Sequence, residues 1–163
     1  MHAAHAAGDR PTAANLVSTL AYQVANVGDP REAVLLARSA RSGAHAHASA
    51  TTRALLGERV AWAHARAGET RHTEHALALV ETEYDQRRPG DESALYTSWL
   101  AEAHLQAGDV DRAAHLAVRT LDLSSSTSSS RGDDRVALLR SRLDPYAAVP
   151  AVGAFLDRCT TTW

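Results

Sequence analysis

The chain has 163 residues, of which 17 are basic and 19 acidic, so its formal net charge is −2 at pH 7. This length suits one domain with a buried core. Charges of both signs are interspersed along the chain. That pattern excludes a basic field able to hold a phosphate backbone, and we expect no direct contact with nucleic acid. Because aromatic residues make up only 5% of the sequence, the core has to consist mainly of Ala, Leu and Val.

Cysteine content and hydropathy predict a cytoplasmic protein. Cys159 is the only cysteine, which excludes an internal disulfide and fits a reducing compartment. The first nine residues lack the basic and apolar regions of a signal peptide. No apolar run is long enough to cross a bilayer, so we expect no membrane contact.

The first nine residues end in a signature that recurs along the chain. Gly8–Asp9 is followed by Ala13, so residues 1–9 are interpreted as the remnant of an earlier helix. A glycine followed by an acidic residue is found again at Gly28–Asp29, Gly68–Glu69 and Gly108–Asp109. These three glycines are separated by 40 residues in both intervals (68 − 28 and 108 − 68). An equal interval found twice indicates an internal repeat.

The residues around each glycine repeat as well. Alanine stands seven residues before it, at positions 21, 61 and 101. After it, small and aliphatic residues recur five, eight, nine and twelve positions on, which is the spacing of a helix that buries one face. Each repeat is therefore predicted to be a first helix, a tight turn and a second helix. In the turn, the glycine takes the left-handed conformation and the acidic residue caps the second helix.

The repeat places six helices on the sequence. First helices are predicted over residues 12–27, 50–67 and 92–107, and second helices over 30–42, 70–84 and 110–122. The three repeats then span residues 10–43, 48–85 and 91–123. Residues that break helices lie in the connections between them.

The C-terminal part departs from the repeat. Residues 124–131 are so rich in serine that a loop is predicted. Two capping helices are expected within residues 132–158, separated by Asp144–Pro145 and Val149–Pro150, and residues 159–163 are expected to form a tail. Because this last pair lacks the glycine turn, it suits the exposed end of a repeat array.

These elements predict one domain, residues 1–163, of the all-α class. Its expected architecture is a right-handed solenoid of stacked antiparallel helix pairs, with about three repeats and a C-terminal capping pair. The turn and the buried face resemble the tetratricopeptide repeat, in which a small residue, Gly-Asp and an alanine of the second helix recur. The 40-residue period is longer than that family's usual unit. Val24, His64 and His104 stand where an aromatic residue is common, so the resemblance is to a divergent branch.

Four longer strings are similar to the C-terminal repeat region of actinobacterial helix-turn-helix transcriptional regulators. They are LAYQVANVGDPREA (20–33), ERVAWAHARAG (58–68), SALYTSWLAE (93–102) and LDPYAAVPAV (143–152). Those regulators join a small DNA-binding domain to a tetratricopeptide-like sensor, so the resemblance implies a regulatory role. Compared with those regulators, we expect this chain to lack the DNA-binding domain and one helix pair at the junction 87–92.

Repeats of this type bind ligands on their concave side, which is lined by first helices. The positions 13, 10, 6 and 2 residues before each glycine are expected to face that side. The candidate partner-binding residues are therefore Asn15, Ser18, Tyr22, Asn26, Leu55, Glu58, Trp62, Arg66, Leu95, Ser98, Glu102 and Gln106. This set combines polar groups with two large aromatic residues, as peptide-binding surfaces do. The alternative is that Tyr22 and Trp62 pack between neighbouring repeats.

Histidine patterns do not predict a metal site, although the chain has nine histidines. His72 and His75 lie three residues apart on one helix, but the paired-histidine motif of zinc proteases is absent, and the single thiol lies far along the chain. His64 and His104 are one repeat apart, which favours structural roles. We therefore predict no metal ligands and no cofactor.

No catalytic residue is predicted either. The sequence contains no nucleophile elbow and no glycine-rich phosphate loop. Glu58 and Glu102 both belong to the predicted groove, but solvated carboxylates are expected there rather than an acid–base pair.

The sequence thus predicts a regulatory module that binds another protein or a peptide and is not an enzyme. One alternative is a small-molecule-binding protein, or an enzyme of a biosynthetic pathway, that uses the concave groove. A homodimer, formed through the face left uncovered at residues 1–8, is a further alternative.

Overall fold

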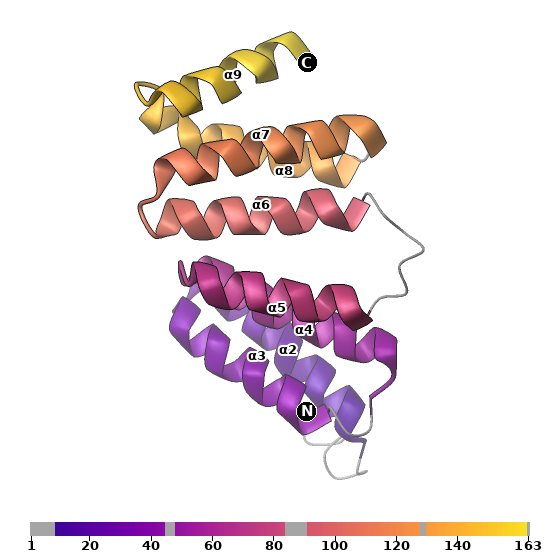
Figure 1. The fold of residues 1–163 in the computed structure, drawn as a ribbon. Helices are drawn as coiled ribbons and strands as arrows, with labels where there is room; N and C mark the ends of the chain where they lie inside the picture. Colours follow the sequence, from indigo (N-terminus) through magenta and orange to yellow (C-terminus); the bar gives the residue numbers. More distant parts are fainter. Residues whose placement is uncertain (1–8, 45–47, 84–90, 128–129, 163) are drawn as a thin grey trace. The chain divides into compact units, whose positions relative to one another are not determined.

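The computed structural model describes residues 9–44, 48–83, 91–127 and 130–162 (Figure 1). Within these ranges the chain forms eight α-helices and one 3₁₀ helix and contains no strand, which confirms the predicted all-α class. The helices are α2 (Arg10–Val27), α3 (Pro30–Ala44), α4 (Ala50–Arg66), α5 (Thr70–Glu83), α6 (Asp91–Gln106), α7 (Val110–Thr127), α8 (Ser130–Leu143), η1 (Asp144–Tyr146) and α9 (Pro150–Thr162). None of them is both long and apolar enough for a membrane span.

The six helices predicted from the repeat correspond to α2 through α7, and their ends shift by at most five residues. Asp9, which was assigned to the remnant of an earlier helix, instead caps α2, because its carboxylate accepts a hydrogen bond from the Thr12 N–H at 3.1 Å. The rest of that remnant, residues 1–8, lies outside the described residues, as do residues 87–90 of the junction.

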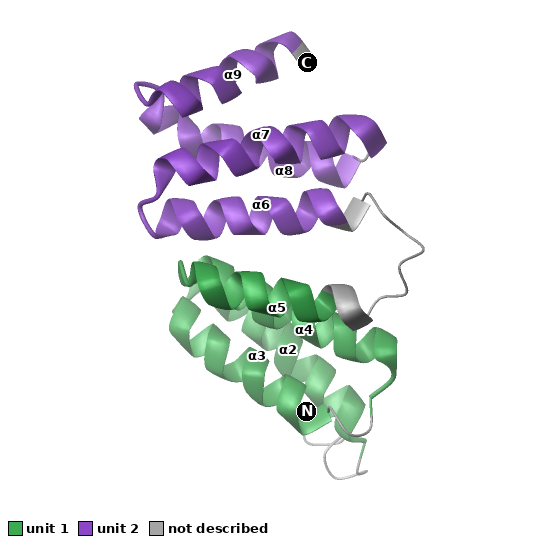
Figure 2. Ribbon diagram, in the orientation of Figure 1, with its two compact units in different colours: residues 1–86 green, residues 87–163 purple. Residues whose placement is uncertain are grey.

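The helices form two compact units, residues 1–86 and 87–163, which Figure 2 shows in different colours. The sequence had been interpreted as a single domain. In the first unit, α2 packs against both α3 and α4, and α4 also packs against α3 and α5. In the second unit, α6 packs against α7 and α8, and α7 also contacts α8 and α9.

A left-handed glycine ends α4, as the repeat predicted. Gly68 has a φ of 72°, a conformation that costs glycine little and other residues more. Two backbone hydrogen bonds close the turn, from the Gly68 N–H to the Ala65 carbonyl at 3.1 Å and from the Glu69 N–H to the His64 carbonyl at 3.0 Å. This bond pair is the left-handed C-cap of a helix, and it turns the chain directly into α5.

The same turn ends α6. Gly108 has a φ of 83°, and the Asp109 N–H donates to the His104 carbonyl at 2.9 Å. The Asp109 carboxylate also accepts a hydrogen bond from the Arg112 N–H at 3.2 Å, so the predicted acidic cap of the second helix is present here.

The turn after α2 has a different geometry, and the prediction of a left-handed Gly28 is wrong. Gly28 has φ −125°, and its N–H donates to the Val24 carbonyl at 2.8 Å. The difference follows from Pro30, which begins α3 and disfavours helical backbone angles at Asp29 before it. Neither of the other two turns has a proline at that position.

Alanine is the most frequent buried apolar residue among the described residues of each unit. Ala21, Ala61 and Ala101, the small residues that precede each turn, are fully buried. Such small side chains let helices approach closely, and Gly57 of α4 shows how closely. A Cβ added there would lie 2.7 Å from Cγ2 of Val80 on α5, so this position has no room even for a methyl group.

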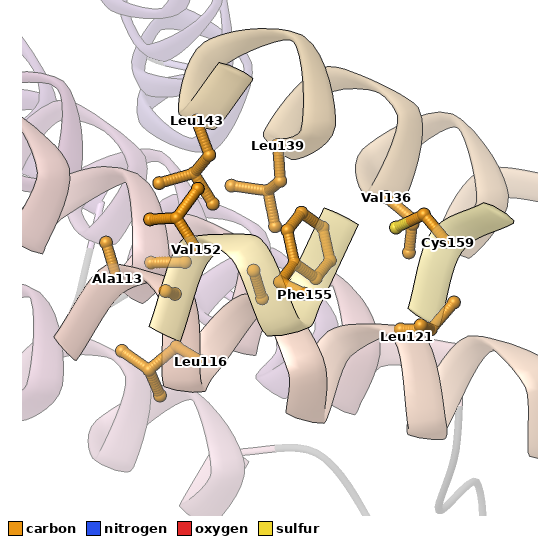
Figure 3. Packing of buried hydrophobic residues seen from close by; sticks show 12 residues of the cluster. Ala113, Leu116, Leu121, Val136, Leu139, Leu143, Val152, Phe155 and Cys159 are labelled. Carbon is orange, nitrogen blue, oxygen red and sulfur yellow. The ribbon is translucent and has the colours of Figure 1, made fainter. Parts of the chain in front are cut away.

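Larger apolar side chains gather where α9 meets α7 and α8 (Figure 3). Phe155, the only phenylalanine in the chain, is fully buried together with Leu139, Leu143 and Val152. The predicted capping helices are therefore well packed. The predicted tail is also largely helical, because α9 continues to Thr162.

The predicted serine-rich loop is wrong over most of its length. Residues 124–127 continue α7, and α8 begins at Ser130; residues 128–129 lie outside the described part of the chain. The Ser126 hydroxyl donates to the Leu123 carbonyl of its own helix at 2.8 Å, so this hydroxyl has a hydrogen-bond partner within α7.

Tertiary contact also holds this segment in place. Ser124 is fully buried, and its hydroxyl donates to the Asp133 carboxylate of α8 at 2.6 Å. Gly132 lies directly against Ser124, and a Cβ added to Gly132 would overlap that side chain. Composition alone could not reveal this contact between α7 and α8.

Two glycine-to-alanine substitutions are expected to change stability in opposite directions. An added Cβ meets no atom within 4 Å at either Gly43 or Gly108, so packing does not distinguish them. Gly108→Ala should lower the free energy of unfolding by about 1 kcal/mol, because its φ is positive. Gly43→Ala should raise it by about 0.5 kcal/mol, because Gly43 lies within helix α3. Chemical denaturation measures both, and a Gly108→Ala variant as stable as the wild type would contradict the left-handed turn.

Candidate functional site

The 12 predicted partner-binding residues divide between the two units. Eight lie on α2 and α4 of the first unit, and four lie on α6 of the second. Exposed members are Asn15, Asn26 and Gln106; half-buried members are Tyr22, Leu55, Glu58, Arg66 and Leu95; buried members are Ser18, Trp62, Ser98 and Glu102. The two sets have different surroundings.

Aromatic rings and arginines form a stack between α2 and α4. The rings of Tyr22 and Trp62 lie 5.9 Å apart between centroids, with 32° between their planes. The Arg59 guanidinium lies 4.5 Å from the centroid of Tyr22, and that of Arg66 lies 5.8 Å from the centroid of Trp62. Arg66 also donates from Nε to the Ala25 carbonyl of α2 at 3.2 Å. We call these four side chains, Arg59, Tyr22, Trp62 and Arg66, the α2–α4 stack.

The sequence left open whether these aromatic residues bind a partner or pack between helices, and the stack has features of both. Trp62 is only 5% exposed, so it packs between helices as the structural alternative expected. Tyr22, Arg59 and Arg66 remain half-buried and keep part of their surface open to solvent. Arg59 was missed because it lies one position away from those selected by the repeat.

The hydroxyl groups of two predicted serines form hydrogen bonds with the backbone of their own helices. The Ser18 hydroxyl donates to the Asn15 carbonyl at 2.8 Å, and the Ser98 hydroxyl donates to the Leu95 carbonyl at 2.6 Å. Both serines are fully buried, and they stand at equivalent positions of the first and third repeats. Neither hydroxyl is offered to a partner on the surface.

Glu102 is fully buried, and the expectation of a solvated carboxylate there is wrong. Two arginines of α8 contact it: Arg142 Nη1 lies 2.9 Å from one carboxylate oxygen, and Arg135 forms an ion pair with the other. Arg135 also donates from Nε to the Ser98 hydroxyl at 2.8 Å. These contacts fasten α6 to α8 and cover the centre of the α6 part of the predicted groove.

A second cluster of polar side chains surrounds the turn between α4 and α5. His64 in the last turn of α4 approaches Glu69, with 2.6 Å between its Nδ1 and the carboxylate Oε2. His72 in the first turn of α5 has its Nδ1 3.7 Å from the same oxygen. The two imidazole rings are stacked, with centroids 5.0 Å apart and 17° between planes.

Burial and the contact with Glu69 act in opposite directions on the pKa of His64. Its removal from water is the main reason that its pKa lies below the usual value for histidine, because burial penalises the charged form. The hydrogen bond and negative charge of Glu69 raise this pKa, while the positive charges of His72 and Arg38 lower it further. The net result favours a neutral imidazole at His64.

The turn after α6 repeats only part of this cluster. His104 Nδ1 lies 3.1 Å from the Asp109 carboxylate, as His64 does from Glu69. Arg112 stands 40 residues after His72, so this turn lacks the second imidazole. The pairing of a histidine with a carboxylate is thus common to the turns after α4 and α6. His72 adds a second imidazole only at the turn after α4.

His64, Glu69 and His72 form the group of potential metal ligands found among the described residues. Sequence reasoning missed the group because it paired His72 with His75, on the same helix. The three ligands instead lie on both sides of a turn, with His64 on α4 and His72 on α5. The signal that could have revealed it is a histidine four residues before the turn glycine, followed by an acidic residue directly after that glycine.

Comparison of the chain with protein families, with curated proteins and with solved structures finds no significant match.

Replacing Glu102 is expected to destabilise the second unit. Glu102→Ala should lower the free energy of unfolding by about 3 kcal/mol, because it leaves the guanidinium of Arg135 without its buried counter-charge. Arg140→Ala, an exposed position on α8, should change the free energy of unfolding by less than about 0.5 kcal/mol. Urea denaturation of the two variants measures the difference. Equal stabilities would show that the buried ion pairs do not hold α6 to α8.

Proposed function

We propose that this chain is a protein- or peptide-binding helical module of the tetratricopeptide-like class, in which antiparallel helix pairs stack into a right-handed solenoid. The matching left-handed turns after α4 and α6 support this class, as do the fully buried alanines that precede each turn. The proposed role is regulatory, in keeping with the resemblance to the sensor part of actinobacterial transcriptional regulators.

The observation that carries the proposal is the α2–α4 stack. Aromatic residues and arginines are the types that dominate binding energy at protein interfaces. The stack holds its members in place before any partner arrives, since each ring contacts a guanidinium or the other ring. Side chains that are already ordered lose less conformational entropy on binding. Exposed Asn15 and Asn26 on the same helix α2 supply hydrogen-bonding groups nearby.

Charge on this face indicates the kind of peptide that it would bind. The stack contains two guanidinium groups, and Glu58 is the one carboxylate among the predicted residues of α2 and α4. A guanidinium that stacks on a ring can still donate hydrogen bonds from its edge. We therefore propose a peptide partner that brings an acidic side chain to Arg59 or Arg66.

Selection from a random peptide library displayed on phage, with the immobilised full chain as bait, tests the proposal. Enriched peptides are expected to contain an acidic and an apolar residue. Their affinity for Tyr22→Ala and Arg66→Ala should fall at least about tenfold. Asn26 is exposed, and Asn26→Ala leaves the ring contacts intact. This variant should therefore weaken binding by a smaller factor.

Leu35→Ala is the matched control, since Leu35 is 67% exposed on α3 and takes no part in the stack. Its affinity for the selected peptides should equal that of the wild type. Enrichment of no peptide, or peptides that bind Tyr22→Ala and Leu35→Ala equally well, would contradict the proposal. Stabilisation of the chain by metabolites alone would favour the small-molecule alternative.

Self-association stays a separate prediction. Leu16, Leu20 and Val27 of α2 are 46%, 44% and 86% exposed, and exposed apolar residues mark an interaction site where they form a contiguous patch. If a second copy covers them, sedimentation velocity should show a dimer for the wild type and a monomer for Leu16→Ser/Leu20→Ser. A wild-type monomer at all concentrations would contradict the homodimer.

A further inference from the structure

The backbone of the α4–α5 turn brings His64 and Glu69 together. In a left-handed C-cap, the side chains at these two positions lie next to each other and are usually apolar. Here a histidine and a glutamate occupy them, joined through the backbone by the hydrogen bond from the Glu69 N–H to the His64 carbonyl. His72 follows Glu69 by three residues and lies on the same face of α5. A single tight turn therefore supplies three groups able to bind a metal.

The distances among these groups are close to those of a coordination sphere. One ligand atom from each residue can be chosen so that all three lie within 4.8 Å of one another. Bonds of about 2.0 to 2.2 Å to a tetrahedral zinc ion separate ligand atoms by about 3.4 Å. The 3.7 Å between His72 Nδ1 and Glu69 Oε2 is already near this value. The hydrogen bond between His64 and Glu69, at 2.6 Å, has to open by less than 1 Å, about the change when a metal replaces the shared proton.

The remaining adjustment falls on the two most exposed of the three side chains. Burial fixes His64, whose side chain is only 6% exposed. The side chains of Glu69 and His72 are 39% and 67% exposed, so rotation about their side-chain bonds can bring them to the ion with no change of backbone. The stacked His72 ring has to turn so that its nitrogen points towards the ion.

The donor set indicates which metals fit. Two imidazoles and one carboxylate suit Zn²⁺ and its transition-metal neighbours, whereas Mg²⁺ and Ca²⁺ require oxygen ligands. The negative charge of Glu69 and the carbonyl end of the α4 dipole favour a cation. The amide end of the α5 dipole and the nearby Arg38 oppose one. The charge of Glu69 outweighs that of Arg38 because the Glu69 carboxylate would bind the ion directly.

We propose that His64, Glu69 and His72 form a binding site for a divalent transition metal, with Zn²⁺ as the best-fitting ion and water in the remaining position. The site shares no residue with the α2–α4 stack and does not depend on the peptide-binding function. The turn after α6 provides an internal control, since His104 and Asp109 lack a counterpart of His72.

Competition between the full chain and a chromogenic zinc chelator tests the site. The wild type is expected to bind one tightly held Zn²⁺ per chain, and Mg²⁺ in excess should not displace it. His72→Ala and Glu69→Gln should each weaken this binding at least tenfold. Glu69 is half-buried and His72 is exposed, and circular dichroism should show that the variants stay folded. His104→Ala, the matched control in the other turn, should bind Zn²⁺ as the wild type does.

Other histidines in the chain could also bind zinc, and the variants separate these cases. Wild-type affinity in His72→Ala or Glu69→Gln would overturn the proposal, as would an equal loss in His104→Ala. Arg112→His supplies the missing imidazole to the turn after α6 and should raise the stoichiometry from one tight site to two. Failure to add this second site would contradict the claim that the turn geometry assembles the ligands.

Thermal unfolding gives a second measurement that does not depend on the chelator. Zn²⁺ should raise the melting temperature of the wild type, because the ion binds the folded turn. The shift should be lost in His72→Ala and retained in His104→Ala. An equal shift in both variants would place the zinc elsewhere and overturn the proposal.

Discussion

The left-handed glycine at the end of a helix is the constraint on which the helix pairs α4–α5 and α6–α7 depend. At Gly68 and Gly108 a positive φ lets the chain reverse within a few residues. The bonds that close each turn satisfy carbonyls left without partners at the helix end. The same geometry places side chains from both sides of the turn in contact. Helix pairing and the histidine–carboxylate contacts therefore have one physical cause.

Small side chains set the second constraint. Alanine buries little apolar surface, so a core rich in alanine gains stability only if helices approach closely and leave no voids. Gly57 of α4 lies so close to Val80 of α5 that a methyl group would not fit between them, so these two helices cannot pack more closely there. In the second unit, Phe155, Leu139 and Leu143 supply larger buried side chains, and the ion pairs of Glu102 provide a polar link that alanine packing could not.

Periodic features could be predicted from the sequence, and features that depend on a distant partner could not. The 40-residue glycine spacing located the helices because glycine acts locally on the backbone. Ser124 was misassigned to a loop because its hydrogen-bond partner on α8 is invisible to composition. Glu102 was expected to be solvated because its arginine partners lie 33 and 40 residues further on. Of the candidate site, the rings of Tyr22 and Trp62 were identified in advance, and the metal ligands were not.

One turn geometry orders the helix pair α4–α5 and assembles its polar cluster. Scalar couplings across hydrogen bonds in solution NMR measure that geometry directly. The account predicts a coupling from the Glu69 amide to the His64 carbonyl, and an equivalent one from Asp109 to His104. Absence of both couplings, together with a negative φ at Gly68, would contradict it.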